Sequence, residues 1–254
     1  MADNLTYLVT GSNRGIGRQI AADLVLRPAT TVVATVRDPE SNTSQSLTTL
    51  PTAAGSRLVV VPLDANREDV GHETLRRRLG DNDVGRLDVI VANAAAPALG
   101  SVLQTEATVA RHCLEVNSIG LLRLFQACWP LLERSDPARG GKKFVLVTSS
   151  IASIQGLETE DFPLTAYGMS KAAANWLAKK ISVEFRDNGL MVGVIHPGWV
   201  KTDMGQALAD AIGAKQPPPL TVEHSARCVV EQVDGLCPET TGRFVSFDGQ
   251  QLPW

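Results

Sequence analysis

Leu5 to Gly17 reads LTYLVTGSNRGIG, an apolar run that stops at a glycine-rich turn. The run is rich in residues that favour β-structure, and it predicts a strand over Leu5–Thr10. After the turn, apolar residues recur with the 3.6-residue period of an amphipathic helix as far as Leu26, and Pro28 lies just beyond. The stretch therefore predicts a strand, a tight turn and a helix, the first unit of an α/β fold.

The same alternation continues along the chain. Further apolar strands are expected over Thr31–Val36, Arg57–Leu63, Leu87–Ala92, Lys143–Thr148 and Met191–His196, with helices near 68–79, 105–133 and 163–186 between them. Strands that are apolar throughout and separated by helices indicate a parallel sheet covered on both faces. We therefore expect a single α/β domain over residues 1–254, a Rossmann-type doubly wound parallel sheet of about seven strands.

The composition is that of a globular protein. The chain has 254 residues, of which 44% are hydrophobic and 20% charged, so it can form a core and is not biased toward disorder. With 24 basic and 27 acidic side chains the net charge is −3. The chain therefore has no excess of positive charge that would attract nucleic acid or an anionic membrane, and neither is expected as a partner.

The cysteines and the first residues indicate a cytoplasmic protein without a metal. Cys113, Cys128, Cys228 and Cys237 form no C-x-x-C pair and have no histidine at metal-ligand spacing, so we expect buried, reduced thiols. The sequence does not open with a basic segment and an apolar stretch, and no apolar run is long enough to span a membrane.

The glycine-rich turn, Gly11-Ser12-Asn13-Arg14-Gly15-Ile16-Gly17, is suited to a pyrophosphate. Its glycines permit a tight turn and a close approach of the backbone, and the helix that follows offers free N–H groups and a positive dipole end. The spacing G-x-x-x-G-x-G differs from the common G-x-G-x-x-G. Its place between the first strand and the first helix nevertheless predicts a dinucleotide site.

The residue that ends the second strand predicts which dinucleotide is bound. An acidic residue about 20 positions after the turn bonds the ribose of NAD, whereas an arginine accommodates the 2′-phosphate of NADP. That position holds Arg37, and Arg14 in the turn is a second guanidinium that can bracket the same phosphate. Asp38 is a complication, because its carboxylate can take the ribose instead. We expect NADP(H).

A second group of polar residues can carry chemistry. Tyr167 and Lys171 are four apart in a predicted helix and share a face. A tyrosine with a pKa near 10 needs a nearby cation to favour the phenolate at neutral pH, and Lys171 can supply one. Ser149 and Ser150 follow the fifth predicted strand, so a serine and the tyrosine hydroxyl can converge on one carbonyl oxygen.

The whole pattern resembles the short-chain dehydrogenase/reductase family over nearly the full chain. Thr10 to Gly17 is similar to the family's T-G-x-x-x-G-x-G turn, and Asn93-Ala94 to its N-A-G segment. Asn117, Ser150, Tyr167 and Lys171 resemble its catalytic tetrad. Two further matches are Asp64, which resembles an adenine-contacting aspartate, and HPGWVKT at 196–202, whose Pro197, Gly198, Val200 and Thr202 resemble the nicotinamide-side stretch.

Within this family the chain resembles the sniffer-like carbonyl reductases and the norsolorinic acid ketoreductases. The resemblance rests on the Asn13-Arg14 pair, the short chain and the final residues Phe247 to Trp254. It implies NADPH-dependent reduction of a ketone or aldehyde of apolar, aromatic or polyketide type. Tyr167 would donate the proton, Ser150 would bond the carbonyl oxygen, Lys171 would hold the ribose and lower the tyrosine pKa, and Asn117 would anchor a water relay.

The sequence also departs from the family pattern. Ala95 stands where the glycine of N-A-G is usual, and the interval from Ser150 to Tyr167 is longer than usual, with Leu157 to Phe162 (LETEDF) as the expected insertion. Ser149 is an alternative catalytic serine, although the family uses the second of the pair. Lys201 to Leu220 is expected to be a loop and short helix that cover the substrate, with a plain surface excursion as the alternative. Trp199 and Met204 are the expected substrate contacts.

Two rival activities stay open, and an oligomer is expected. Hydride transfer is reversible, so the enzyme can instead oxidise a secondary alcohol with NADP. A fold of this kind can also serve a cyclase, an isomerase or a cofactor sensor. The family associates through the helices predicted at 105–133 and 163–186. Apolar surface on these two helices is supplied by Leu121, Leu122, Phe125, Trp176 and Leu177. A homodimer or homotetramer is therefore expected.

Overall fold

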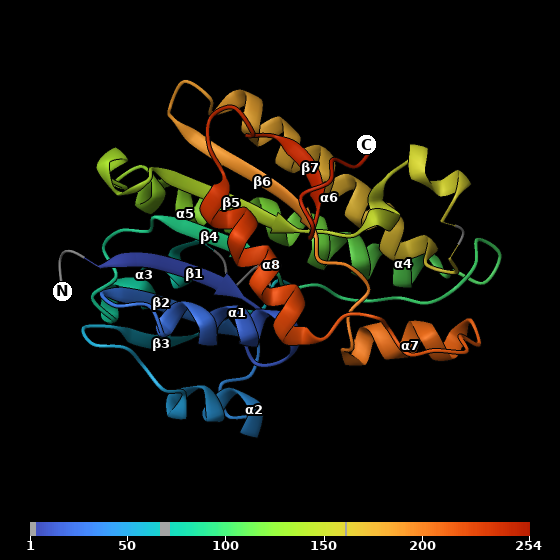
Figure 1. The fold of residues 1–254 in the computed structure, drawn as a ribbon, viewed down its shortest axis with the longest axis horizontal. Helices are drawn as coiled ribbons and strands as arrows, with labels where there is room; N and C mark the ends of the chain where they lie inside the picture. Colours follow the sequence, from blue (N-terminus) through green and yellow to red (C-terminus); the bar gives the residue numbers. More distant parts are fainter. Residues whose placement is uncertain (1–3, 67–71, 161) are drawn as a thin grey trace.

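A computed structural model describes residues 4–66, 72–160 and 162–254, and Figure 1 shows its fold. One parallel sheet of seven strands has the order β3-β2-β1-β4-β5-β6-β7, which is the doubly wound arrangement predicted from the sequence. The strands are β1 (Leu5–Thr10), β2 (Thr30–Val36), β3 (Arg57–Pro62), β4 (Val89–Ala92), β5 (Lys142–Val147), β6 (Leu190–His196) and β7 (Arg243–Ser246).

Helices cover both faces of this sheet. They are α1 (Gly15–Val25), α2 (Asn42–Gln45), α3 (His72–Asp81), α4 (Ala107–Leu114), α5 (Gly120–Leu132), α6 (Thr165–Glu184), α7 (Asp203–Ala211) and α8 (Val222–Gly235). The start of the helix predicted near 68–79 falls within 67–71, outside the described residues.

Alternate residues of the strands build two apolar layers. Leu8, Ile90 and Phe144 pack with α3, α5 and α6 on one face. Val9 and Val91, their neighbours in sequence, pack with α1 and α8 on the other face, which is in front in Figure 1. Because successive strand residues point to opposite faces, strands buried on both sides need the continuous apolar runs found in the sequence.

The helix predicted over 105–133 is two helices joined by a π-helical turn. The turn, Glu115–Ile119, separates α4 from α5 and contains Asn117. Single π turns inside α-helices often occur at functional sites. The polar side chains of Asn117 and Ser118 bond to neighbouring segments here, and periodicity of apolar residues carries no signal for such an interruption.

Two expectations about burial were wrong. Leu121 and Phe125, predicted to supply surface between subunits, are buried against the sheet. Two of the four cysteines, Cys228 and Cys237, are partly accessible, while Cys113 and Cys128 are buried as expected; all four are free thiols.

The sequence did not locate β7, a four-residue strand at the sheet edge. Its outer side is covered by residues that follow it. Gln251 pairs antiparallel with Val245, and the amide of Leu252 donates to the carbonyl of Phe244 (2.9 Å). The edge strand is therefore paired on both sides.

Candidate active site

Loops that follow the strands meet at one end of the sheet, at the right in Figure 1. In a parallel sheet all carboxyl ends lie at this edge, where open α/β folds bind ligands. The glycine-rich turn after β1, the segments after β4 and β5, and the loop from β6 to α7 all lie at this end. The residues singled out from the sequence are distributed over these segments.

The glycine-rich turn has the backbone that the sequence predicts. Gly11 and Gly15 have φ of +68° and +56°, a region that favours glycine. A Cβ on Gly17 would lie 2.4 Å from Asn93 Nδ2 and 2.5 Å from the Gly11 carbonyl oxygen, so only glycine fits. Ser12 is buried and its hydroxyl donates to the Val9 carbonyl (2.8 Å). No side chain caps α1, so its first N–H groups are available to an anion.

Asn93 and Ala94 join the end of β4 to this turn. Their backbone amides both donate to Thr10 Oγ1 (2.9 Å each), and Asn93 Nδ2 donates to the Thr10 carbonyl (2.9 Å). The segment after β4 therefore lies against the turn, where the family resemblance requires it. Ala95, the departure from N-A-G, is partly buried next to it.

The two arginines expected around a phosphate have different surroundings. Arg37 is exposed at the end of β2, next to Asp38, whose carboxylate accepts from the amide of Glu40 (3.0 Å). Arg14 instead forms an exposed ion pair with Asp203 at the start of α7 (2.7 Å). Such pairs contribute little stability, so this one can be exchanged for another anion at small cost.

Three other expected cofactor residues lie near this edge. Asp64 follows β3 and accepts from the amide of Asn66 (3.0 Å). Asn13 Nδ2 donates to Thr43 Oγ1 (3.4 Å), which connects the turn to α2. Ile16 packs in the apolar layer of α1.

Tyr167 and Lys171 are buried on one face of α6. Lys171 Nζ donates to the carbonyl of Val147 (2.9 Å), the last residue of β5, and lies 5.8 Å from the centroid of the Tyr167 ring. Burial lowers the pKa of Lys171 to about 8. Burial, with a smaller effect of Cys113, raises the pKa of Tyr167. The expectation that Lys171 lowers the tyrosine pKa is not met here, because desolvation of the phenolate dominates.

Ser150 and its neighbour differ in what they bond. Ser149 Oγ accepts from the amide of Ile151 (3.4 Å) as the cap of a short 3₁₀ turn, Ser150–Ala152. The amide of Ser150 donates to Nδ1 of His196 (3.1 Å), at the end of β6. Because Ser149 serves as a cap, Ser150 is the better candidate for the reacting hydroxyl.

Asn117 uses its side chain to join three segments. Its Oδ1 accepts from the amide of Ala96 (2.7 Å), and its Nδ2 donates to the Ala96 carbonyl (3.0 Å) and to Ser170 Oγ (2.8 Å). Ser118 Oγ donates to the Ser170 carbonyl (2.7 Å). The π turn is thus bonded to the helix that carries Tyr167 and to the segment after β4.

The loop after β6 borders the glycine-rich turn. Thr202 caps α7 by accepting from the amide of Gly205 (3.1 Å), and its methyl group would be 3.4 Å from a Cβ on Gly15. Gly198 has φ of +83°, and a Cβ there would lie 2.2 Å from Leu220. Pro197 and Val200, also expected beside the nicotinamide, are buried in this loop.

The two expected substrate contacts lie at the start of the segment 201–220. Trp199 Nε1 donates to the Gly205 carbonyl (3.1 Å), whereas Met204 is exposed on α7. The amide of Lys201 donates to the Leu220 carbonyl (2.8 Å), so the two ends of this segment lie side by side.

Two polar residues that bond segments of the candidate active site, His196 and Asn175, were not predicted from the sequence. His196 was not among the expected site residues, yet its Nδ1 accepts from the amide of Ser150, and burial lowers its pKa to about 4. Asn175 was not considered, although Tyr167, Lys171 and Asn175 follow each other at intervals of four on one helix face. That repeat of polar residues on an apolar helix was the signal available.

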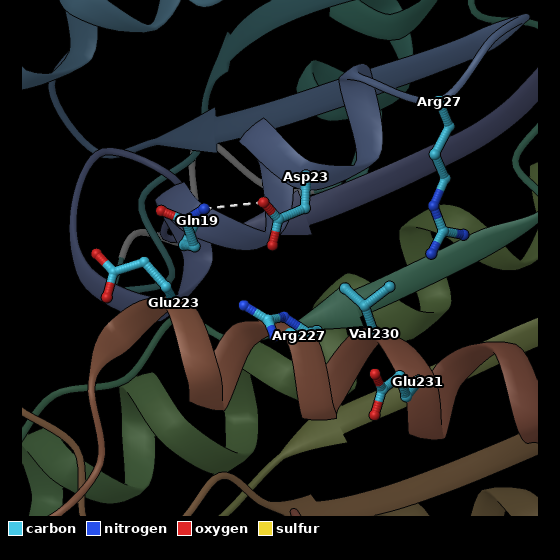
Figure 2. Close-up of a pocket in the computed structure, with 7 residues that line it drawn as sticks. All are labelled: Gln19, Asp23, Arg27, Glu223, Arg227, Val230 and Glu231. Atoms are coloured by element: carbon cyan, nitrogen blue, oxygen red, sulfur yellow. Dashed lines mark hydrogen bonds between the residues drawn. The ribbon is translucent and has the colours of Figure 1, made fainter.

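Other parts of the molecule do not compete with this site. A groove of about 440 Å³ lies between α1 and α8, and Figure 2 shows side chains of both charges around it. No candidate catalytic residue lines this groove. Within the described ranges, no cluster of three or more metal-ligating side chains occurs, and no helix is long and apolar enough to cross a membrane.

Comparison with known proteins is consistent with the geometry. The family model described as "short chain dehydrogenase" matches residues 6–213. Norsolorinic acid ketoreductase nor1 of Dothistroma septosporum is 39% identical over 98% of this chain and 92% of its own length. NADPH-bound carbonyl reductase from chicken fatty liver superimposes with a TM-score of 0.86, at 26% identity over 99% of this chain and 100% of that one. An NADP complex of a carbonyl reductase from Pseudomonas aeruginosa is 31% identical, with a TM-score of 0.78, over 99% and 100% of the two chains.

Proposed function

Because the chain belongs to the short-chain dehydrogenase family, we propose that it is an NADPH-dependent carbonyl reductase that converts a ketone or aldehyde to the alcohol. The observation that carries this proposal is that α6, the helix of Tyr167 and Lys171, is bonded on two sides. Lys171 bonds the end of β5 just before Ser150, and Asn117 bonds Ser170 on the same helix. The ketoreductase and carbonyl reductase names of the relatives support the same activity.

The glycine-rich turn fits the diphosphate of NADP(H). The uncapped start of α1 offers N–H donors and a positive dipole end, and Gly17 lets the backbone approach closely. Arg37 is exposed at the end of β2, where a 2′-phosphate would be bonded, and Asp64 and Asn93 border the same edge. The neighbours named as NADPH-bound and NADP-bound carbonyl reductases support the phosphorylated cofactor.

When bound, the cofactor supplies the hydride, and the residues of this chain handle the proton and the developing charge. Tyr167 donates its phenolic proton to the carbonyl oxygen, while the hydroxyl of Ser150 donates a hydrogen bond to it. Lys171, whose pKa of about 8 keeps most of the amine protonated at neutral pH, supplies a positive charge 5.8 Å from the centroid of the Tyr167 ring. Asn117 bonds Ser170 and so holds the π turn against α6. In this proposal it anchors the water relay that returns a proton to Tyr167.

Exposed apolar side chains around the site favour an apolar or aromatic carbonyl compound. They belong to the segments that follow β4, β5 and β6, and they are Leu99, Val102, Leu103, Ile154, Leu157, Met204 and Ile212. Exposed apolar side chains on segments at the ligand-binding edge of the sheet suit a surface for such a compound. The segment 201–220 covers the substrate in this proposal, and the insertion at 157–162, apart from Asp161, which is outside the described residues, shapes its entrance.

We also propose that the protein is a homo-oligomer through α4, α5 and α6. Met169, Trp176 and Val183 form an exposed apolar row on α6 at intervals of seven, and Ile119 and Leu122 are exposed near the start of α5. A row at this spacing lies along one side of a helix and suits packing against a second copy.

Loss of NADPH absorbance with a panel of aromatic, polycyclic and aliphatic ketones tests the function. We expect turnover with the apolar ketones and a loss of about a thousandfold or more in Tyr167→Phe, because the phenolic proton is removed. NADPH affinity of the variant, measured by fluorescence, should stay within about twofold.

Substantial turnover in Tyr167→Phe would contradict the proton-donor role. NADPH binding without reduction of any ketone would instead favour the non-redox interpretation of the fold.

A further inference from the structure

A buried pair of polar side chains connects α6 to the end of β5. Thr148 Oγ1 donates to Asn175 Oδ1 at 2.6 Å, and both residues are only 3% exposed. Thr148 immediately precedes Ser149 and Ser150. Asn175 is one turn beyond Lys171 on α6. The pair therefore joins the segment that carries Ser150 to the helix that carries Tyr167.

This pair is not explained by stability. Asn175 lies among the apolar residues Ala174 and Ala178 of the core, and its Nδ2 has no hydrogen-bond partner in the described part of the chain. A buried donor without a partner costs free energy, whereas replacing both members of such a pair by apolar groups of similar shape is often neutral or stabilising. An apolar pair would serve packing at least as well.

The neighbouring contacts show what the pair can control. Lys171 Nζ bonds the carbonyl of Val147, and Asn175 bonds the side chain of Thr148, so two successive residues of one segment bond two successive turns of α6. These two bonds fix the position of the helix along the strand end. Reacting groups misplaced by about 1 Å can lose a hundredfold in rate.

We propose that Thr148 and Asn175 are positioning residues, which hold the Ser150 hydroxyl in register with the Tyr167 hydroxyl. The proposal rests on the carbonyl reductase function argued above. It adds a role for two residues that touch neither substrate nor cofactor.

The double variant Thr148→Val/Asn175→Leu tests this proposal. We expect kcat to fall about tenfold, NADPH affinity to change less than about twofold, and the thermal midpoint to equal or exceed that of the wild type. The single variant Thr148→Ser, which keeps the hydroxyl, should retain kcat within about twofold. A purely structural role predicts instead that stability and activity fall together.

The chain offers a matched control at the opposite end of the sheet. Asn4 Nδ2 donates to Thr31 Oγ1 (3.3 Å) in another buried pair, far along β2 from the reacting edge. Thr31→Val should leave kcat unchanged. If the double variant does not fold, the single variants Thr148→Val and Thr148→Ser make the same comparison.

Wild-type kcat in the double variant, or equal loss in Thr148→Ser and Thr148→Val, would overturn the positioning role. If the wild type reduces no carbonyl compound, the proposed function fails. Crystal structures of the wild type and the double variant then decide the positioning role. An unchanged distance between the Ser150 and Tyr167 hydroxyls in the double variant would overturn the positioning role, and a changed distance would support it.

Discussion

His196 connects two neighbouring strand ends at the candidate active site. Its Nδ1 accepts from the amide of Ser150, which requires a ring that is unprotonated at this nitrogen. Burial lowers its pKa to about 4, partly opposed by Glu160 and Asp248, so the ring is neutral near pH 7. The bond that holds the Ser150 backbone is therefore present at physiological pH.

Acid should weaken the fold through this histidine. The pKa of His196 is near 6.5 in the unfolded chain and about 4 in the folded protein. Between these two pH values the unfolded state binds a proton that the folded state does not. The free energy of unfolding therefore falls as the pH drops from about 6.5 to 4. The histidine accounts for up to about 3 kcal/mol of this loss. Urea unfolding at a series of pH values should show a shallower pH dependence in His196→Asn.

The exposed His112 provides the comparison, and His112→Asn should follow the wild-type curve. A wild-type slope in His196→Asn would show that other groups cause the acid sensitivity.

Arg37 should decide the choice of cofactor. We expect Arg37→Asp to lower kcat/KM for NADPH relative to NADH by about tenfold to a hundredfold, because a charge-assisted bond to the 2′-phosphate is lost and an acid that accepts from the ribose is gained. Arg14→Ala should lower the same ratio, since the exposed ion pair of Arg14 with Asp203 can be exchanged for the phosphate at small cost. Steady-state kinetics with both cofactors measure this, and an unchanged ratio in Arg37→Asp would contradict it.

The sequence predicted single residues well where their chemistry is local. Tyr167 and Lys171 lie on one face because a spacing of four in a helix demands it. The partners of Lys171 and His196 were not predictable, because they depend on strand ends 24 and 46 residues away. The raised pKa of Tyr167 was also missed, since burial depends on the packed fold and not on the neighbour in sequence.

Among the elements, the turn between β1 and α1 is the most constrained. Gly17 lies inside the first turn of α1, and its neighbours are the side chain of Asn93 and the backbone of Gly11. The strand, turn and helix could be predicted from residues 5–28, because apolar periodicity and glycine positions encode them. The contact of Gly17 with Asn93 could not be predicted, since it depends on the pairing of β1 with β4.

Gly17→Ala should therefore damage the cofactor site. The added methyl group meets Asn93 Nδ2 and the Gly11 carbonyl, so we expect a loss of about 1–3 kcal/mol in unfolding free energy and weaker NADPH binding. Gly80→Ala is the control, because nothing lies within 4 Å of a Cβ there and α3 should gain up to about 1 kcal/mol. Urea unfolding and NADPH titration distinguish the two; wild-type affinity in Gly17→Ala would refute the close approach.

Other elements show where periodicity is not sufficient. The π turn at Glu115–Ile119 follows from polar contacts of Asn117 and Ser118 with distant residues, and it interrupts a helix that reads as continuous. β7 has only four residues, and its pairing with β6 depends on the sheet already being in place.

At the scale of the whole molecule, the outer side of α6 carries a row of exposed apolar side chains. Trp176 is 69% exposed at the middle of the row formed with Met169 and Val183. The inner side of the same helix carries Tyr167 and Lys171. A second copy that packs on this helix would therefore contact the element that positions Tyr167 and Lys171.

Trp176→Glu should shift the protein toward the monomer. A charge at the centre of an apolar contact is desolvated without a partner, which commonly costs several kcal/mol. Light scattering after size exclusion measures the mass. Leu26→Glu, which alters an exposed apolar residue after α1, should leave the mass unchanged. A wild type that is monomeric at micromolar concentration would contradict the proposed oligomer.

The pairing of Gln251 with Val245 leaves the outer side of β7 with no free row of amides and carbonyls. A free strand edge invites a second chain to add its own strand, and repeated addition produces open assemblies. Here the chain has filled that position with its own residues. In the proposed oligomer, copies would meet through α6 with the same surface on each partner, and a contact of that kind closes after two subunits. The covered edge thus prevents a second chain from extending the sheet at β7, and leaves α6 as the surface for association in the proposed oligomer.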